Sequence, residues 1–240
     1  MSDKPNKTYV FIFTTLMCLI SGLLLTASST VLKERQNRNI EIDKQKNVLK
    51  SVGLVKLKDV YMDKEIEDLF NTNISEYFVG PSGEILESNE KANDLLKLYI
   101  YKKNGKINSY IIPVETRGLW GKIKGYLALK NDGSTIVGFS VYSHSETPGL
   151  GGEIEQGWFT RNFVGKKIVD GTNQFVSIGI AKGSVSDTVS DKMKDNYVDG
   201  ISGATLTGSF LTKGLESILA RYEKVSVRFR QEHLKNSPKK

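Results

Sequence analysis

The stretch Leu96–Val114, LKLYIYKKNGKINSYIIPV, predicts the fold more clearly than any other part of the sequence. Two runs rich in β-branched and aromatic residues flank Asn104-Gly105, and this dipeptide is a strong signal for a tight β-hairpin. Two further apolar runs, 125–130 and 134–143, flank Asn131-Asp132-Gly133 and predict a second hairpin. Consecutive hairpins indicate an antiparallel sheet.

Helical and extended patterns lie on both sides of these hairpins. Apolar spacing predicts a helix over 34–52, closed by Gly53, and a shorter helix that begins at Asp63. Further along the chain we expect a turn at Pro81-Ser82-Gly83, a strand over 175–181 and an amphipathic helix over about 207–223. The sum is an α+β domain with helices packed on an antiparallel sheet.

The N-terminal region has no charged side chain from Thr8 to Leu32. Roughly 20 apolar residues suffice to cross a bilayer, so residues 8–32 are the predicted transmembrane helix, after a short basic lead at 1–7. A cleaved signal peptide is the alternative, because Ala27-Ser28-Ser29 resembles a cleavage site. We favour an uncleaved anchor because the apolar run is longer than the core of a signal peptide.

Charge divides the rest of the chain. The formal net charge is +7, but basic residues are concentrated in 33–58, an expected membrane-proximal helix or linker, and towards the C-terminal end. We expect a soluble domain over 59–225 and a basic tail over 226–240. Charge beside the membrane favours attraction to anionic lipid, and no nucleic-acid partner is expected.

The short basic lead predicts that the N-terminus lies in the cytoplasm of a bacterial inner membrane. Long domains translocate largely regardless of flanking charge, so we expect the soluble domain on the periplasmic side.

The composition leaves little room for chemistry based on sulfur or imidazole. Cys18 is the single cysteine, and His144 and His233 are the only histidines. This excludes an internal disulfide framework, a thiolate zinc or iron–sulfur site and a histidine-rich metal centre, so no metal is expected.

Two glycine-rich motifs stand out. ETPGLGGE at 146–153 is not a dinucleotide fingerprint, because Ile154 occupies the position of the third glycine. DGISGATLTG at 199–208 places small and hydroxylated residues directly before the predicted amphipathic helix. The N-terminus of a helix favours a phosphate, although serine and threonine are also ordinary helix caps.

These motifs carry a resemblance to a known family. Asp199–Thr205 fits the pattern D-x-x-[S/T]-G-A-T of proteins that receive covalent flavin mononucleotide (FMN), and ETPGLGGE is the companion motif. RGLWGKIKGYLAL at 117–129 is similar to the stretch that precedes it in one member. The order of the three motifs, the length and the N-terminal anchor resemble the NqrC family, whose members are subunits of sodium-translocating NADH:quinone reductases.

The resemblance implies a site for FMN. Its phosphate would form an ester with the hydroxyl of Thr205, and Asp199 would belong to the signal read by a flavin transferase. Trp120 is a candidate neighbour of the flavin ring, with a core tryptophan as the alternative, and Leu119 is expected to pack internally. The other residues that would surround the flavin are Glu146, Thr147, Gly149, Leu150, Gly151, Ser202, Gly203, Ala204, Leu206 and Thr207.

The resemblance also implies a function. The chain would be a one-electron relay that takes no part in NADH chemistry by itself, within a complex that couples NADH oxidation and ubiquinone reduction to sodium export. Its partners would be the other subunits of that complex, one of them a flavin protein that exchanges electrons with it. Two alternatives remain open: the homologous flavin-carrying protein of the related Rnf ferredoxin:NAD reductase complex, and a membrane-anchored ligand-binding module without redox chemistry.

Overall fold

The computed structural model describes residues 7–56, 59–87 and 95–236. The chain forms two compact units, Met1–Ile42 and Asp43–Lys240, and the helix α1 (Lys7–Ser51) contributes to both.

The first unit is the N-terminal part of α1. Its window of highest mean hydropathy, 2.3, is long and apolar enough to cross a membrane, and none of that window is buried within the protein. The hydroxyls of Thr15, Thr26 and Thr30 donate to the carbonyl oxygens one turn earlier, at 2.8–2.9 Å. These bonds satisfy the hydroxyls inside the helix, as a lipid environment requires.

The second unit is built on a six-stranded antiparallel sheet. The strand order is β2-β1-β3-β4-β5-β6, which leaves β2 and β6 at the edges. The strands are β1 (Ile74–Val79), β2 (Ile85–Leu86), β3 (Leu96–Lys103), β4 (Lys106–Arg117), β5 (Lys122–Lys130) and β6 (Ile136–Ser143).

Both predicted hairpins are confirmed. Asn104 and Gly105 connect β3 to β4 with φ of 52° and 74°, the left-handed pair that a two-residue turn requires. The β5–β6 connection is held by Asp132, whose Oδ1 accepts hydrogen bonds from the N–H groups of Ser134 and Thr135 at 2.9 and 2.8 Å.

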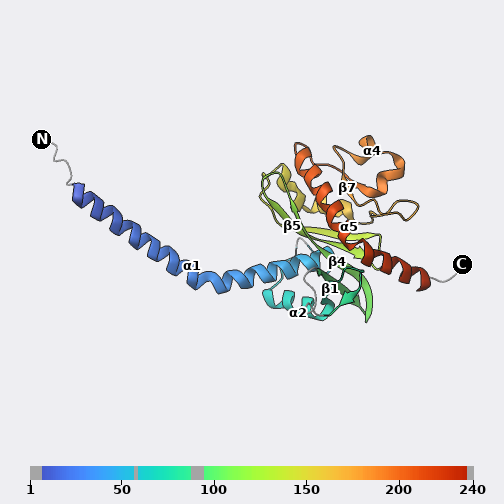
Figure 1. Ribbon diagram of the computed structural model, residues 1–240, viewed down its shortest axis with the longest axis horizontal. Helices are drawn as coiled ribbons and strands as arrows, with labels where there is room; N and C mark the ends of the chain where they lie inside the picture. Colours follow the sequence, from blue (N-terminus) through green and yellow to red (C-terminus); the bar gives the residue numbers. More distant parts are fainter. Residues whose placement is uncertain (1–6, 57–58, 88–94, 237–240) are drawn as a thin grey trace. The chain divides into compact units, whose positions relative to one another are not determined.

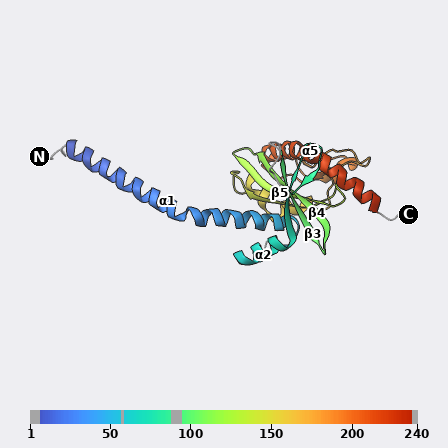
Figure 2. The ribbon, with the colours of Figure 1, turned by 60° about the horizontal axis from the view of Figure 1, so that its bottom comes forward.

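One face of the sheet is covered by α5 (Thr205–Asn236), shown in red in Figures 1 and 2. Alternate residues of the central strands, such as Ile100 and Ile112, form the core with Leu211, Leu215 and Leu219 of the helix. Tyr110 of β4 holds the C-terminal half of α5 against the sheet. Its ring stacks on Phe229 at a centroid separation of 4.4 Å, and its hydroxyl donates to Ser226 Oγ.

The other face is covered by α2 (Asp63–Asn73) and by the end of α1, and α2 lies opposite α5 in Figure 2. Phe70 of α2 packs edge-on against Tyr99 of β3. Ser140 of β6 donates its hydroxyl to the carbonyl of Asn47 in α1 at 2.8 Å. The central strands are thus buried on both faces, which explains their nearly continuous apolar runs.

Residues 144–204, between the sheet and α5, form short elements. They are η1 (Gly151–Glu155), α3 (Gly157–Thr160), η2 (Arg161–Phe163), β7 (Gly179–Ile180), α4 (Val185–Thr188), η3 (Asp191–Asn196) and β8 (Tyr197–Val198). The predicted strand over 175–181 is wrong for most of its length. Only Gly179 and Ile180 form a strand, parallel to β8, and Ser177 has a φ of 67°.

Two predicted boundaries are displaced. α5 is longer than the predicted 207–223, and Phe229 is buried, so the folded domain continues past 225. Val48, Leu49 and Val55 are also buried, so the C-terminal part of the predicted linker 33–58 belongs to the folded unit.

Candidate functional site

The predicted attachment motif, Asp199–Thr205, ends at the first residue of α5. Ile201 and Ala204 are buried and hold the segment against the core, whereas Ser202 and Thr205 are exposed. Gly203 adopts a φ of 74° and turns the chain into the helix. The first N–H groups of a helix have no intrahelical partner, and together with the helix dipole they favour an anion beside Thr205.

The two threonines of this turn have opposite surroundings. Thr205 is exposed, and its hydroxyl has no partner within the part of the chain that the structure describes. Thr207 is 2% exposed and donates its hydroxyl to Glu146 Oε2 at 2.5 Å. Of these two hydroxyls, that of Thr205 is exposed and that of Thr207 is buried and already hydrogen-bonded.

Glu146 is a buried carboxylate that joins three segments. It is 4% exposed, and its Oε1 accepts the backbone N–H of Trp120 at 3.0 Å while Oε2 accepts the hydroxyl of Thr207. The β4–β5 turn, the loop after β6 and the first turn of α5 therefore meet at one side chain. Its negative charge also lies near the positive end of the α5 dipole, which is a favourable placement.

The loop after β6 packs closely on this carboxylate. The N–H groups of Leu150 and Gly152 both donate to the carbonyl of Thr147, at 3.1 and 2.9 Å. A Cβ atom at Gly151 would lie 2.6 Å from Thr207 Oγ1 and 2.8 Å from Glu146 Oε2, so only glycine fits.

His144 also supports the loop, a role that the sequence reasoning missed. Its Nδ1 accepts the backbone N–H of Glu146 at 3.1 Å, and its Nε2 lies 3.3 Å from Glu155 Oε2. Because Nδ1 accepts a hydrogen bond, the ring proton belongs on Nε2. The one signal in the sequence was a histidine two residues before the motif.

These segments enclose a cavity of about 350 Å³, a size typical of small-molecule sites. Trp120 at its rim is 70% exposed, which excludes the alternative of a core tryptophan. Leu119 also lines the cavity and is partly exposed, so the prediction that it packs internally is wrong. The lining residues are Leu119, Trp120, Glu146, Thr147, Leu150, Gly151, Gly203, Ala204, Thr205, Leu206 and Thr207.

Three predicted site residues do not line this cavity. Gly149 lies in the same loop with a φ of 75°, and Ser202 lies in the turn before α5. Asp199 points elsewhere: its Oδ1 accepts the N–H of Val185 at 2.7 Å, in the first turn of α4. Asp199 thus fixes α4 against the attachment motif.

Thr205 also lines a second cavity, which no pattern in the sequence predicted. It has a volume of about 610 Å³ and lies along α5 next to the β7–β8 region. Lys182 and Lys213 supply positive charge there, and Ser190, Ser209 and Thr212 supply hydroxyls. Such a lining suits a phosphate and a polyol chain.

The residues present fit FMN. The hydroxyl of Thr205 and the N-terminus of α5 match its phosphate, and exposed apolar side chains match the planar ring. These apolar side chains are Leu119, Trp120, Leu150 and Leu206.

Comparison with known proteins agrees with this geometry. Residues 118–220 match the model of the FMN-binding domain family. The structure resembles the crystal structure of the NqrC protein of the Na(+)-translocating NADH-quinone reductase from Parabacteroides distasonis, with a TM-score of 0.69 and 29% identity. That match covers 81% of this chain and 96% of the other. A Shewanella oneidensis NqrC structure shares the fold, with a TM-score of 0.62 and 22% identity.

Two curated relatives match over nearly the whole length. The NqrC protein of the Na(+)-translocating NADH-quinone reductase of Pseudomonas aeruginosa is 30% identical, over 91% of this chain and 92% of its own. The same protein of Haemophilus ducreyi is 30% identical, over 92% of this chain and 96% of its own. The chain therefore belongs to the NqrC family of Na(+)-translocating NADH-quinone reductase subunits.

Proposed function

We propose that the chain is a membrane-anchored electron-relay subunit that holds FMN covalently on Thr205. Its complex would couple NADH oxidation and ubiquinone reduction to sodium export. Family membership supports the complex, and the FMN-binding domain match supports the cofactor. The observation that carries the attachment site is the exposed, unpartnered hydroxyl of Thr205, two residues from a threonine whose hydroxyl is buried and bonded.

The chain's own residues would hold and orient the cofactor. Bound FMN supplies one-electron transfer, chemistry that no side chain here provides. Thr205 would retain it through a phosphoester, so the ring contacts need not provide retention. Trp120 and Leu150 would contact the ring, while Glu146 would fix the loop that carries Leu150 against α5.

The partners follow from this role. A flavin transferase would load Thr205 during maturation, and an adjacent flavin protein of the complex would exchange electrons at the open rim of the cavity. Matches to NqrC proteins over the whole length favour this complex over the Rnf alternative.

The attachment site is tested by substituting threonines after coexpression with a flavin transferase. Thr205→Val removes the only hydroxyl that we expect to form the ester, so in-gel flavin fluorescence should vanish. Thr207→Val and Ser209→Ala should keep it. Mass spectrometry of the tryptic peptide Asp195–Lys213 should show one added FMN. Flavin that persists in Thr205→Val and disappears in Thr207→Val would overturn the assignment.

We further propose that α1 crosses the inner membrane once and that the domain lies in the periplasm. The helix is apolar and its threonine hydroxyls are hydrogen-bonded to its own backbone, which supports a membrane span. Long domains cross the membrane largely regardless of flanking charge, which supports the orientation. Protease added to intact spheroplasts should digest the domain. A domain that stays protected until the cells are lysed contradicts this orientation.

A further inference from the structure

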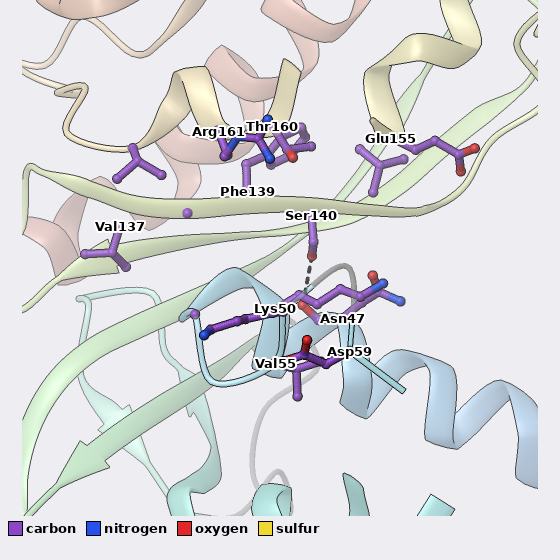
Figure 3. Close-up of a pocket in the computed structure, with 15 residues that line it drawn as sticks. Asn47, Lys50, Val55, Asp59, Val137, Phe139, Ser140, Glu155, Thr160 and Arg161 are labelled. Atoms are coloured by element: carbon purple, nitrogen blue, oxygen red, sulfur yellow. Dashed lines mark hydrogen bonds between the residues drawn. The ribbon is translucent and has the colours of Figure 1, made fainter. Parts of the chain in front are cut away.

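A further cavity, separate from the two beside Thr205, lies at the open edge of the sheet (Figure 3). β6 is the last strand of the sheet order, and its residues 137–141 line this cavity of about 490 Å³. The end of α1 with the following loop forms one wall, and residues 155–164 form the other. None of the lining residues belongs to the cavities beside Thr205.

Apolar side chains make up much of the lining. Phe139 and Val141 are buried and project from β6, and Val55 is buried in the opposite wall. Val137 and Val164 complete the apolar surface. The volume is within the range of roughly 300–1,000 Å³ that small-molecule sites occupy.

The charges around the cavity are unbalanced. Lys50, Lys56 and Arg161 line it, and within residues 7–56, 59–87 and 95–236 no carboxylate lies within 4.0 Å of their cationic groups. The two acids in the lining have other partners. Glu155 lies 3.3 Å from His144 Nε2, and Asp59 accepts the hydroxyl of Tyr61 at 3.3 Å.

A cation without a counter-charge lowers the stability of the fold where burial shields it from water. Lys50 is half-buried, and burial together with the neighbouring charge of Lys46 lowers its pKa, although Asp43 and Glu155 act in the opposite direction. Figure 3 shows Lys50 and Arg161 on the two sides of β6. A negative group in the cavity at the open edge of β6, which both side chains line, would supply the missing counter-charge.

We propose that this cavity binds a small organic monoanion with an apolar body. Its acidic group would pair with Lys50 and Arg161, and its apolar body would contact Phe139, Val137 and Val141. The geometry of the guanidinium favours a carboxylate, which it binds through two parallel hydrogen bonds. The proposal does not depend on the flavin site.

The probe for the test is 4-benzoylbenzoate, an aromatic carboxylate that forms covalent bonds with nearby C–H groups under ultraviolet light. The full chain in detergent is irradiated with increasing probe, digested with trypsin and analysed by mass spectrometry. We expect saturable labelling of the peptides Asn131–Arg161 and Ser51–Lys56. The uncharged methyl ester should label these peptides far less, because it lacks the carboxylate.

Single variants separate charge from packing. Lys50→Gln and Arg161→Gln should each raise the half-saturating probe concentration by about tenfold, the cost of losing one charge-assisted hydrogen bond. Each change removes a tryptic site, so the labelled peptides to follow become Asn47–Lys56 in Lys50→Gln and Asn131–Lys166 in Arg161→Gln. The matched substitutions Lys103→Gln and Arg221→Gln remove exposed cations outside the cavity and should leave it unchanged.

A further variant tests whether the probe needs the volume of the cavity, without changing any charge. Val137→Trp retains both cations but fills the cavity, so saturable labelling should be lost while the thermal unfolding midpoint stays close to that of the parent chain. Equal labelling by acid and ester, unchanged half-saturation in both cation variants, or labelling confined to other peptides would each overturn the proposal.

Discussion

Thr205 and Thr207 show what a motif conveys about single residues. Both belong to a run of small and hydroxylated residues, and the sequence placed both beside the cofactor. Residues two apart on a helix point to different sides, so one threonine faces solvent and the other faces Glu146. The sequence predicts the cluster, but the direction of each hydroxyl depends on where the helix begins.

Glu146 is the single residue on which the site geometry depends most. Glu146→Gln keeps the shape, and its amide can still accept the Trp120 N–H and donate to the Thr207 hydroxyl oxygen, but two charge-assisted hydrogen bonds become neutral ones. We expect the free energy of unfolding to fall by about 2 kcal/mol, measured by urea denaturation. The matched control is Glu153→Gln in the same loop, where the carboxylate accepts Trp158 Nε1 near the surface.

The control should change the free energy of unfolding by about 0.5 kcal/mol or less. Equal losses in the two variants would show that Glu146 contributes no more than a surface contact.

Among the helices and strands, those fixed by neighbouring residues could be predicted from the sequence. Strand pairs formed by segments that are distant in the sequence could not. Asn104-Gly105 fixes a hairpin by its own backbone preference, so β3 and β4 were predictable. The parallel pair β7–β8 depends on a distant contact, Gly179 with Tyr197, which no local pattern reveals. The apolar run 175–181 therefore looked like a full strand but supplies only two strand residues.

The β5–β6 connection carries a pH-dependent contribution to stability. Burial alone would raise the pKa of Asp132, but hydrogen bonds from the N–H groups of Thr135 and Ser134 outweigh it and lower the pKa below its ordinary value. A carboxyl with a lowered folded-state pKa stabilises the fold above its unfolded-state pKa of about 3.9. That stability is lost as the pH falls through the folded-state value.

Asp132→Asn removes the charge of this carboxylate and keeps its shape. At pH 7 the variant should lose about 1 kcal/mol of unfolding free energy, because its neutral amide oxygen is a weaker acceptor. Between pH 5 and pH 2, the parent chain should lose more unfolding free energy than the variant, measured by urea denaturation at each pH. Parallel pH profiles would contradict the role of this carboxylate.

Across the whole molecule, the distribution of charge in the sequence predicted the apolar N-terminal segment and the folded domain, but not the residues at which the domain begins and ends. The charge-free run 8–32 was visible in the sequence, whereas the basic run 33–58 was predicted to be a membrane-proximal helix or linker outside the soluble domain. Val48, Leu49 and Val55 in the C-terminal part of this run are buried in the folded unit. The basic residues around them give the run a polar composition, so composition alone does not reveal these buried side chains. Likewise, Phe229 lies in the basic C-terminal region and still packs on Tyr110.

Truncation distinguishes the predicted limit from the structural one. A chain that begins at Lys33 lacks the apolar run but keeps the whole of the unit Asp43–Lys240, so it should be soluble without detergent and unfold cooperatively. A chain that begins at Asp59 lacks Val48, Leu49 and Val55. Each such buried side chain contributes about 1.5–3 kcal/mol, so this second chain should lose about 5 kcal/mol or remain unfolded. Urea denaturation followed by circular dichroism measures both, and equal midpoints would place the domain limit near residue 59, as the charge pattern alone predicted.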